Sequence, residues 1–423
     1  MARLLFDKAV PEHFGYGNNN KQFLTDEEIH FNEFICFKNQ KDKYCYRLFT
    51  EGDKRRIETS YYIGVDWLKK EELVIQVEPK INSGIAQTNY LKMLSVAMSH
   101  PGTSDLVKDI YEIKFDAEPI EINQQDDLLT PLLVIQYVNL LKNIVRKGLI
   151  KSYHKQESNL KSRIKGKILV SQSIKENLVK NRALFTKCSF EVFDEDIPVN
   201  RILKKALEFS KRYMSMFNLK LDQDKLNYIS PAFEHVSSNT FSQDLKGIKI
   251  NSFYKEYNEA LSLANLIMRR FGYNINSIEK SQQIKTPPFW IDMSLLFELY
   301  TLALLKDSLS NDVIFQFHGN YGFPDYLIKS KRMIADAKYK PVYADASFDI
   351  DNIRQISGYA RDMKVRAELG AIDKEELDCL IIYPDSSSEN TDLVNLESKL
   401  EPIEQFAGFY KVGVKLPLSK GIT

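Results

Sequence analysis

The chain has 423 residues with 58 Lys and Arg against 57 Asp and Glu, so its formal net charge is +1. At roughly 100–200 residues per domain, this length predicts two to four domains and excludes a peptide hormone or a single small module. The near-zero charge argues against a surface committed as a whole to nucleic acid. No stretch reaches the ~18 consecutive apolar residues of a membrane span. Asp7 interrupts the apolar start, so we expect no secretion signal, a cytoplasmic location and no membrane partner.

The first hundred residues alternate polar and apolar side chains in the manner of short strands. Turn-prone clusters such as Asn39–Asp42 and Glu51–Asp53 separate these strands. We therefore predict a small antiparallel sheet or barrel, followed by helices. The predicted strands are 31–37, 44–49, 56–65 and 73–77, and the predicted helices are 91–98 and 132–144.

A basic segment follows between Lys142 and Arg182. It holds twelve Lys and Arg against Glu157 and Glu176, which gives a local net charge of +10 and leaves −9 for the rest of the chain. One interpretation is a surface that faces nucleic-acid phosphates. The other is a solvated helix and hairpin, and charge alone does not decide between them.

The second half of the chain changes from helices to an α/β alternation. Helices are predicted over 198–217 and 257–270, and the polar segment 274–288 predicts a boundary because it ends in Thr-Pro-Pro. Beyond it, the predicted elements are a helix over 294–309, strands at 313–317, 325–328 and 333–339, a helix over 350–363, and strands at 378–383 and 409–416.

Two of these strands carry residues typical of metal-assisted chemistry. A tight turn between them would bring Asp325, at the start of one strand, beside Asp336, near the end of the other. Because side chains alternate along a strand, Asp336 and Lys338 share a face. Carboxylates suit Mg²⁺, which activates a bound water, and a lysine can position that water or stabilise negative charge. The pattern predicts phosphodiester cleavage, and the alternative is a surface hairpin with ordinary charges.

Two helices add polar side chains to this candidate site. Glu298 stands in an otherwise apolar helical stretch, where a charge is costly unless it is paired or bound to metal. Gln355 and Tyr359 are four residues apart and project from one helix face, where they could position the lysine, a water or a phosphate. The alternatives are an exposed helix-face glutamate and an ordinary surface pair.

These residues together resemble the PD-(D/E)xK nuclease superfamily, which combines a helical acid, Pro324-Asp325, Asp336-Ala337-Lys338 and a Gln-x-x-x-Tyr helix. More closely, the chain resembles the McrC family, the nuclease subunits of McrBC restriction systems that act on DNA with modified cytosine. The segments that carry the resemblance are 289–294, 296–298, 334–339, 355–359 and 380–384, with weaker similarity at 163–168, 200–206 and 78–81.

The resemblance implies an α+β multidomain fold. Residues 1–159 would form a small antiparallel β domain with helices that binds a partner protein. Residues 160–423 would form the nuclease region, with a basic, helical lead-in over 160–283 and a catalytic core over 284–423. That core would be an α/β restriction-endonuclease-like domain with a mixed central sheet.

The resemblance also assigns roles to individual residues. Asp325, Asp336 and the backbone carbonyl of Ala337 would bind Mg²⁺, which Mn²⁺ could replace. Lys338 would be the catalytic cation and Glu298 an accessory acid. The remaining roles are orientation of phosphate or lysine by Gln355 and Tyr359, and contact with double-stranded DNA by Arg163, Lys165 and Lys167.

The implied partner is an AAA+ GTPase of the McrB type, which reads the modified base and whose GTPase this chain would stimulate. The sequence contains no Gly-x-x-x-x-Gly-Lys-Ser/Thr loop, so we expect this chain to bind no nucleotide itself. Two alternatives stay open. The chain could be a non-catalytic activator or scaffold of an AAA+ motor with a degenerate nuclease fold, or a stand-alone PD-(D/E)xK nuclease.

Overall fold

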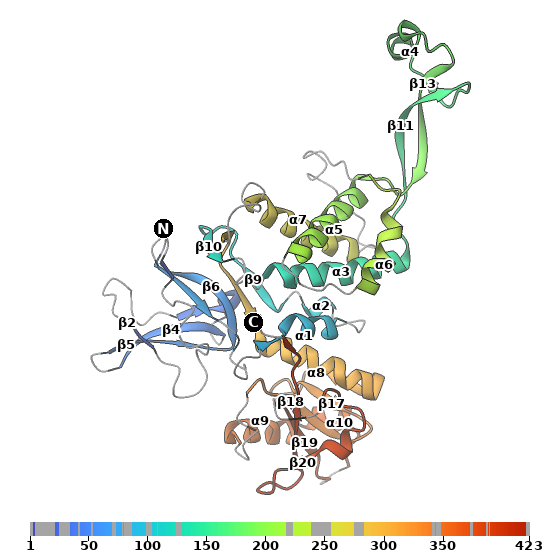
Figure 1. Ribbon diagram of the computed structural model, residues 1–423. Coiled ribbons are helices and arrows are strands. Elements are labelled where there is room, and N and C mark those ends of the chain that lie inside the picture. Colours follow the sequence, from blue (N-terminus) through green and yellow to red (C-terminus); the bar gives the residue numbers. More distant parts are fainter. Residues whose placement is uncertain are drawn as a thin grey trace. The chain divides into compact units, whose positions relative to one another are not determined.

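The elements of the computed structural model fall into two compact units (Figure 1). The first unit combines Met1–Gln136 with Tyr273–Thr423, and the second, which we call the inserted unit, spans Tyr137–Gly272. The residues that the structure describes are 3–4, 22–24, 34–40, 43–51, 54–69, 73–77, 79, 87–98, 104–107, 109–123, 129–216, 223–237, 255–274, 283–340, 343, 348–372, 375–385, 388 and 390–419.

Two largely antiparallel sheets form the early part of the first unit, as the alternating side chains predict. The order in the four-stranded sheet is β2 (Gln22–Leu24), β5 (Lys54–Thr59), β4 (Tyr44–Glu51) and β3 (Phe34–Cys36). The order in the five-stranded sheet is β1 (Arg3–Leu4), β7 (Leu73–Val77), β6 (Tyr62–Lys69), β15 (Phe289–Asp292) and β9 (Tyr111–Ile113). The strand predicted over 56–65 is therefore two strands in different sheets, divided at Ser60 and Tyr61.

Strand β15 comes from the second half of the chain, yet it lies between β6 and β9. It passes so close to Gly64 that an added Cβ would lie 2.0 Å from the carbonyl oxygen of Phe289, so this position requires glycine. Trp290 is fully buried and donates from Nε1 to Asp66 Oδ2 at 2.9 Å, and Lys114 Nζ binds the same oxygen at 2.6 Å. These contacts fix the place where the following helix begins.

Further contacts join the early and late parts of the first unit. Strand β10 (Ile120–Asn123) pairs with β14 (Gln283–Thr286), and β8 (Gln87–Thr88) pairs with β22 (Leu418–Ser419), both antiparallel. Helix α1 (Tyr90–Ala97) packs on α8 (Met293–Leu309). The side chain of Asn89 caps α1 by accepting the N–H of Lys92 at 3.0 Å. The two parts of the sequence therefore fold as one compact unit.

A six-stranded mixed sheet forms the late part of the first unit. Its order is β16 (Val313–Phe315), β17 (Tyr326–Ile328), β18 (Met333–Ala337), β19 (Asp378–Pro384), β21 (Phe409–Val414) and β20 (Glu401–Pro402). The three strands β18, β19 and β21 are parallel, and the other pairings are antiparallel. The predicted α+β composition and mixed sheet are confirmed.

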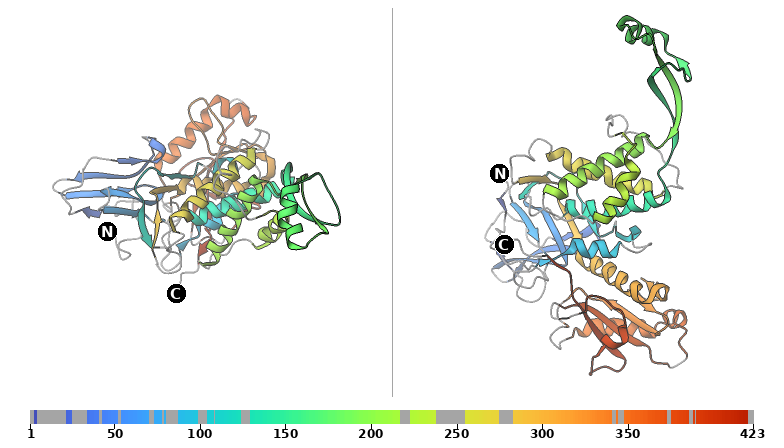
Figure 2. Two further views of the ribbon diagram at one scale, coloured as in Figure 1. Left: turned by 90° about the horizontal axis from the view of Figure 1, so that it is seen from above. Right: turned by 45° about the vertical axis from the view of Figure 1, so that its right-hand side comes forward.

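Helices cover both faces of this sheet (Figure 2). On one face, α9 (Ile350–Arg361) and α10 (Met363–Glu368) share an apolar core with the strands. On the other face lies α8, where the hydroxyl of Tyr326 donates to the carbonyl oxygen of Glu298 at 2.7 Å. Asp362 separates α9 from α10 by capping α10, so the helix predicted over 350–363 ends at Arg361.

The inserted unit is largely helical. Its four longer or central helices are α3 (Leu129–Lys147), which begins in the first unit, α5 (Pro198–Met216), α6 (Gln223–Ile229) and α7 (Lys255–Asn274), and the short helix α4 (Val170–Glu176) is described below. Buried hydroxyls connect them: Tyr137 donates to the carbonyl of Leu203 at 2.6 Å, and Tyr257 donates to Asn200 Oδ1 at 3.2 Å.

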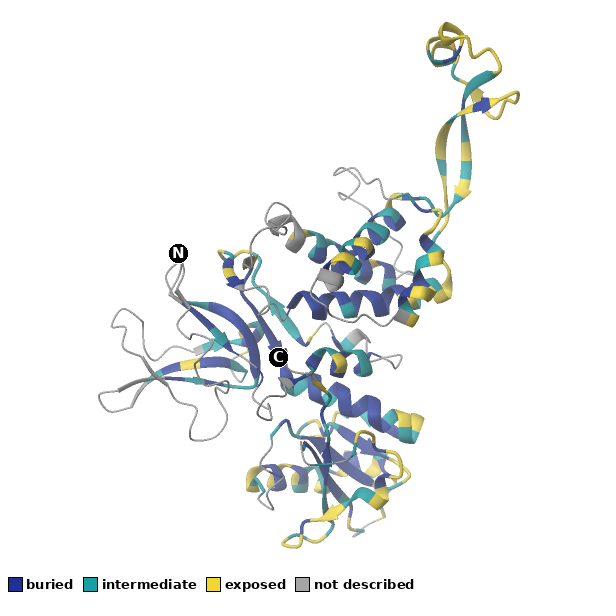
Figure 3. Cartoon of the chain, viewed as in Figure 1, coloured by how far each residue is buried: buried dark blue, intermediate teal, exposed yellow. Residues whose placement is uncertain are grey.

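A long two-stranded ribbon extends from these helices, and we call residues 152–194 the arm (Figures 1 and 2). Strands β11 (Ser152–Lys161) and β13 (Phe185–Asp194) pair over their full length, and β12 (Lys167–Ile168) and α4 (Val170–Glu176) lie between them in sequence. Most arm residues beyond the ribbon are exposed (Figure 3). The exposed large apolar side chains of the arm are Tyr153, Ile164, Ile168, Val170, Ile174, Leu178, Val179, Leu184 and Phe193.

The two compact units do not follow the predicted domain boundaries. The boundary between residues 159 and 160 falls inside β11, and the one near residue 284 falls inside β14. The physical reason is that β14 and β15 pair with strands from the early chain, which local sequence patterns do not reveal. Within the described ranges, no helix combines the length and the apolar character needed to cross a membrane.

Candidate active site

The predicted hairpin forms, and it brings the two aspartates together. Strands β17 and β18 pair with Tyr326 opposite Ala335, so the next positions outward are Asp325 and Asp336. Asp325 Oδ2 accepts the backbone N–H of Ala337 at 2.8 Å. Asp325 is therefore hydrogen-bonded to Ala337, the residue between Asp336 and Lys338.

A chain of polar contacts runs from the strand to helix α9. Lys338 Nζ lies 2.5 Å from Asp336 Oδ2 and donates to Gln355 Oε1 at 3.2 Å. Gln355 Nε2 in turn donates to the hydroxyl of Tyr359 at 2.8 Å. The Asp336 side chain is 2% exposed and that of Lys338 is 18% exposed. Gln355 thus contacts the lysine directly and Tyr359 contacts Gln355, and contact with the lysine is one of the roles that the sequence left open for this pair.

The electrostatic surroundings keep Lys338 charged. Burial disfavours its ammonium form, but the carboxylates of Asp336, Asp325 and Glu298 outweigh this effect and raise the pKa of Lys338 above its ordinary value. A lysine in this state is a fixed positive charge that can stabilise anionic oxygens, rather than a base that removes a proton.

Two of the acids resist ionisation. Burial, followed by the nearby charges of Asp336 and Glu298, raises the pKa of Asp325 well above its usual range. Burial, followed by the charges of Asp292 and Asp336, raises the pKa of Glu298 to about 8. The acids therefore crowd one another in a site of restricted solvent access, which is typical of functional clusters.

Glu298 reaches this cluster from α8, whose start is fixed by β15. Asp292 ends β15 and caps the helix by accepting the N–H of Leu295 at 3.0 Å. One turn and a half further on, Glu298 faces Gln316, whose Nε2 lies 3.5 Å from Glu298 Oε2. The hydroxyl of Thr301, which lies 2.6 Å from that of Tyr326, adds a second attachment of α8 to β17.

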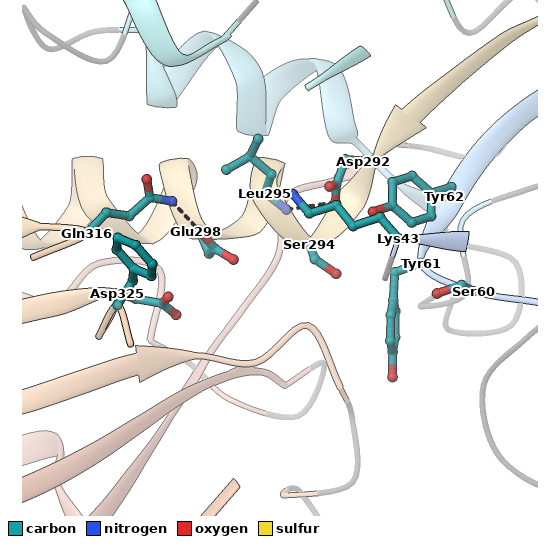
Figure 4. A pocket seen from close by; sticks show the side chains of 11 residues that line it. Lys43, Ser60, Tyr61, Tyr62, Asp292, Ser294, Leu295, Glu298, Gln316 and Asp325 are labelled. Carbon is teal, nitrogen blue, oxygen red and sulfur yellow. Dashed lines mark hydrogen bonds between the residues drawn. The ribbon is translucent and has the colours of Figure 1, made fainter. Parts of the chain in front are cut away.

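Three of the acids, Asp292, Glu298 and Asp325, line a cavity of about 340 Å³. Figure 4 shows Asp325 and Gln316 at one end of the cavity, Glu298 and Ser294 along it, and the side chains of the early sheets at the other end. The lining residues are Lys43, Ser60, Tyr61, Tyr62, Asp292, Ser294, Leu295, Glu298, Gln316, Phe323 and Asp325.

The loop between β16 and β17, which leads into Asp325, is held by Asp362. The Oδ2 atom of Asp362 accepts the backbone N–H of Asn320 at 2.6 Å and that of Tyr321 at 3.2 Å. Slight burial opposes ionisation, but the N–H donors outweigh it and hold the pKa of Asp362 below its ordinary value. At Gly322, where φ is +141°, an added Cβ would lie 2.6 Å from the Tyr359 ring. Contacts with Asp362 and Tyr359 therefore hold the loop in this conformation.

Residues 57–364 match the model of the McrBC 5-methylcytosine restriction system component. The chain belongs to this McrBC family. The match begins in β5 and ends in α10, so it includes Glu298, Asp325, Asp336, Lys338 and the α9 pair, and it confirms the family membership expected from the sequence.

Two of the solved structures that are similar to this McrBC-family chain are assemblies from Thermococcus gammatolerans. The chain is 14% identical, with a TM-score of 0.37, to a chain of a half-complex of Thermococcus gammatolerans McrB AAA+ hexamers with bound McrC, covering 89% of this chain and 82% of that one. It is 16% identical, with a TM-score of 0.28, to a chain of the T. gammatolerans McrBC complex. That match covers 59% of this chain and 67% of the other chain. No curated protein matches the sequence.

The McrBC-family match extends over the predicted DNA contacts as well, which lie on the arm. Arg163, Lys165 and Lys167 are exposed there, and Lys165 Nζ lies 4.3 Å from the centre of the Phe190 ring. The arm belongs to the inserted unit and the acids to the first unit, and contact of these three side chains with DNA stays a prediction. Sequence reasoning missed Lys43, Gln316 and Asp362, and no local pattern marks them.

Proposed function

We propose that this McrBC-family chain is the metal-dependent DNA-cleaving subunit of a restriction complex, and that its six-stranded sheet is a PD-(D/E)xK restriction-endonuclease-like core. One observation carries the proposal: Asp325, Asp336 and Lys338 meet at the ends of two paired strands, with the lysine in contact with both Asp336 and Gln355. This combination of acids and a fixed cation suits cleavage of a phosphodiester.

The donor set fits a hard divalent cation such as Mg²⁺, with Mn²⁺ as a substitute. Mg²⁺ binds proteins through one or two carboxylates and keeps several waters. The described part of the chain holds no cluster of three His, Cys, Asp or Glu side chains able to cage a metal, so we expect an open site of this kind. The pKa values of Asp325 and Glu298 are raised first by burial and then by repulsion from neighbouring acids, and a bound cation would favour the charged form of both groups.

Each residue then has a specific task. Asp325 and Asp336, with the carbonyl of Ala337, would hold the cation, which supplies an activated water and neutralises charge on the phosphate. Lys338 donates hydrogen bonds to the anionic phosphate oxygens, and Gln355 and Tyr359 keep its ammonium in place. Glu298, with a pKa of about 8, can accept or release a proton near neutral pH beside these groups.

We further propose an AAA+ GTPase of the McrB type as partner and double-stranded DNA as substrate. The matched family is a component of a 5-methylcytosine restriction system, and the similar solved assembly contains McrB AAA+ hexamers with bound McrC. The exposed apolar side chains of the arm support a surface that another protein covers. Its basic positions Arg163, Lys165 and Lys167 support contact with phosphates.

The test uses the full chain mixed with its AAA+ partner, GTP, Mg²⁺ and duplex DNA containing 5-methylcytosine. We expect Lys338→Ala to slow cleavage at least about 100-fold, since a preorganised charge at a transition state contributes about 10²–10³ in rate. Stimulation of the partner's GTPase should not change. Arg354→Ala is the matched control, because Arg354 lies on α9 next to Gln355 but points to solvent, 72% exposed.

Other outcomes would support the alternatives. Cleavage by Lys338→Ala at the wild-type rate would contradict the proposed site. A wild-type chain that stimulates the GTPase but never cuts DNA would be a scaffold. A wild-type chain that cuts DNA without any partner would be a stand-alone nuclease.

A further inference from the structure

The early sheets contribute one wall of the cavity that Glu298 and Asp325 line. Lys43 precedes β4, and Ser60 and Tyr61 connect β5 to β6. These residues lie at the end of the cavity opposite Asp325 (Figure 4). The proposed nuclease site is thus not built by the six-stranded sheet alone.

Among the described residues that line this cavity, Lys43 is the only cation, and it lies there with the acids Asp292, Glu298 and Asp325. Its charge lowers the pKa of Asp292, although burial outweighs this effect and leaves that pKa raised. Among the residues that the structure describes, no carboxylate forms an ion pair with Lys43, so its charge is available to a ligand. An ammonium at the edge of an acidic cavity attracts an anion that enters with the metal.

The backbone around these residues is well anchored. The N–H of Lys43 donates to the carbonyl of Gln40 at 2.9 Å, and the carbonyl of Lys43 accepts the N–H of Phe37 at 2.7 Å. The ring of Tyr61 lies edge-on to Tyr339, 6.3 Å between ring centres, and Tyr339 directly follows Lys338. The wall from the early sheets is therefore in contact with the segment that follows β18 and carries Lys338.

We propose that Lys43, assisted by the hydroxyl of Ser60, binds a DNA backbone phosphate next to the scissile one. This inference rests on the proposed nuclease function. An ammonium binds a phosphate oxygen as a compact point charge, and a neighbouring hydroxyl supplies a further hydrogen bond. Lys338 acts on the phosphate at the metal, and Lys43 holds the adjacent phosphate at the far end of the cavity. Lys43 is a positioning residue, and the early sheets become part of the substrate site.

The experiment compares Lys43→Ala, Lys43→Arg and Lys92→Ala in the assembled complex. Lys92 is the matched control, because it is an exposed lysine of the same unit that does not line the cavity. Binding of 5-methylcytosine duplex DNA is measured with Mg²⁺ on an Asp336→Asn background, so that binding is read without cleavage. Cleavage is then measured with the single variants.

Lys43→Ala should weaken DNA binding about 10-fold, the reduction expected for removal of one charge-assisted hydrogen bond. The slope of log K against log salt should fall by about 1, because the variant neutralises one phosphate fewer. KM should rise while kcat changes less than about 3-fold, and Lys43→Arg should recover most of the affinity.

Two results would overturn the inference. In the first, Lys43→Ala binds and cuts DNA like Lys92→Ala. In the second, kcat falls with an unchanged salt slope, which would mean that Lys43 acts through Asp292 and α8 instead of a phosphate. If Lys43→Ala unfolds, Lys43→Gln gives the same comparison. Failure of the nuclease proposal itself looks different, because the wild-type complex would then not cut DNA at all.

Discussion

The end of the six-stranded sheet and the arm both gather charged residues, but they expose them very differently. At the sheet, Asp336 and Lys338 are 2% and 18% exposed and contact each other. On the arm, Arg163, Lys165 and Lys167 are exposed to solvent. A buried charge interacts strongly with its neighbours and costs desolvation energy, whereas exposed charges act weakly and by their sum. Substitutions at the sheet should therefore have large individual effects, and those on the arm should accumulate.

The sharpest test of this difference is Asp325→Asn. The amide oxygen can still accept the N–H of Ala337, but the negative charge is removed. Cleavage should fall at least about 100-fold, as expected when a metal ligand or transition-state charge is taken away. The same variant, without metal at pH 7–8, should be more stable than the wild type, because burial and the neighbouring acids raise the pKa of Asp325 and disfavour its carboxylate form in the folded state.

The measurements are DNA cleavage in the assembled complex and urea unfolding of the full chain in EDTA. Asp351→Asn serves as the control, since Asp351 is 82% exposed and pairs only with Arg354 among its described partners. An Asp325→Asn chain that is less stable than the wild type would show that the acids do not repel one another as described.

A change of pH should have a smaller effect, and this effect is on the free energy of unfolding. The pKa of Glu298 is raised from 4.5 to about 8, so the folded state holds a proton that the unfolded state has released. The stability from this proton is complete below pH 4.5 and is lost as pH rises through about 8. Without metal, the unfolding free energy should fall by on the order of 2 kcal/mol between about pH 6 and 9.

Denaturant unfolding at several pH values, in EDTA, measures this dependence. Glu298→Gln should reduce the slope, because a glutamine has no proton to release. The exposed Glu404→Gln should keep the wild-type slope. If the unfolding free energy of Glu298→Gln depended on pH as steeply as that of the wild type, Glu298 would not belong to the buried acid cluster.

Substitutions on the arm should have the smallest effect on DNA cleavage. Replacing Arg163, Lys165 and Lys167 together with glutamine should lower the salt slope of DNA binding by about 0.9 for each phosphate that is no longer neutralised. The maximal cleavage rate at low salt should change less than about 3-fold, because none of these side chains lines the catalytic cavity. Salt titrations of binding by the assembled complex measure the slope, with Lys92→Gln as reference.

A different result would assign the arm to the partner instead. If the triple variant keeps the salt slope but assembles poorly with the AAA+ protein, the arm is a protein-binding surface. In that case the exposed apolar side chains, not the basic ones, determine its role.

The hairpin that brings Asp325, Asp336 and Lys338 together could be predicted from sequence because its geometry is local. Strand alternation places Asp336 and Lys338 on one face, and a short connection places Asp325 opposite. Helical spacing likewise predicts that Gln355 and Tyr359 share a face, and the structure shows them hydrogen-bonded to each other. These relations depend on a few consecutive residues, so the sequence is sufficient to specify them.

The rest depends on contacts between distant segments. Lys43 reaches the cavity only because β15 enters the early sheet and sets the start of α8 there. The two-part first unit has the same origin, since residues 137–272 interrupt it in sequence but not in its packing. Neither relation has a periodic signature, so no local pattern in the sequence predicts the extra wall of the site.

Strand β15 also limits how evolution or protein engineering could replace the part of the chain that carries the six-stranded sheet. A fragment starting near residue 284 would expose Phe289, Trp290 and Ile291, which are at most 1% exposed in the intact chain. A fragment of residues 1–159 would leave the edges of β6 and β9 open to pairing with other chains. Recombination between related proteins should therefore transfer the early sheets and the six-stranded sheet together, as one unit.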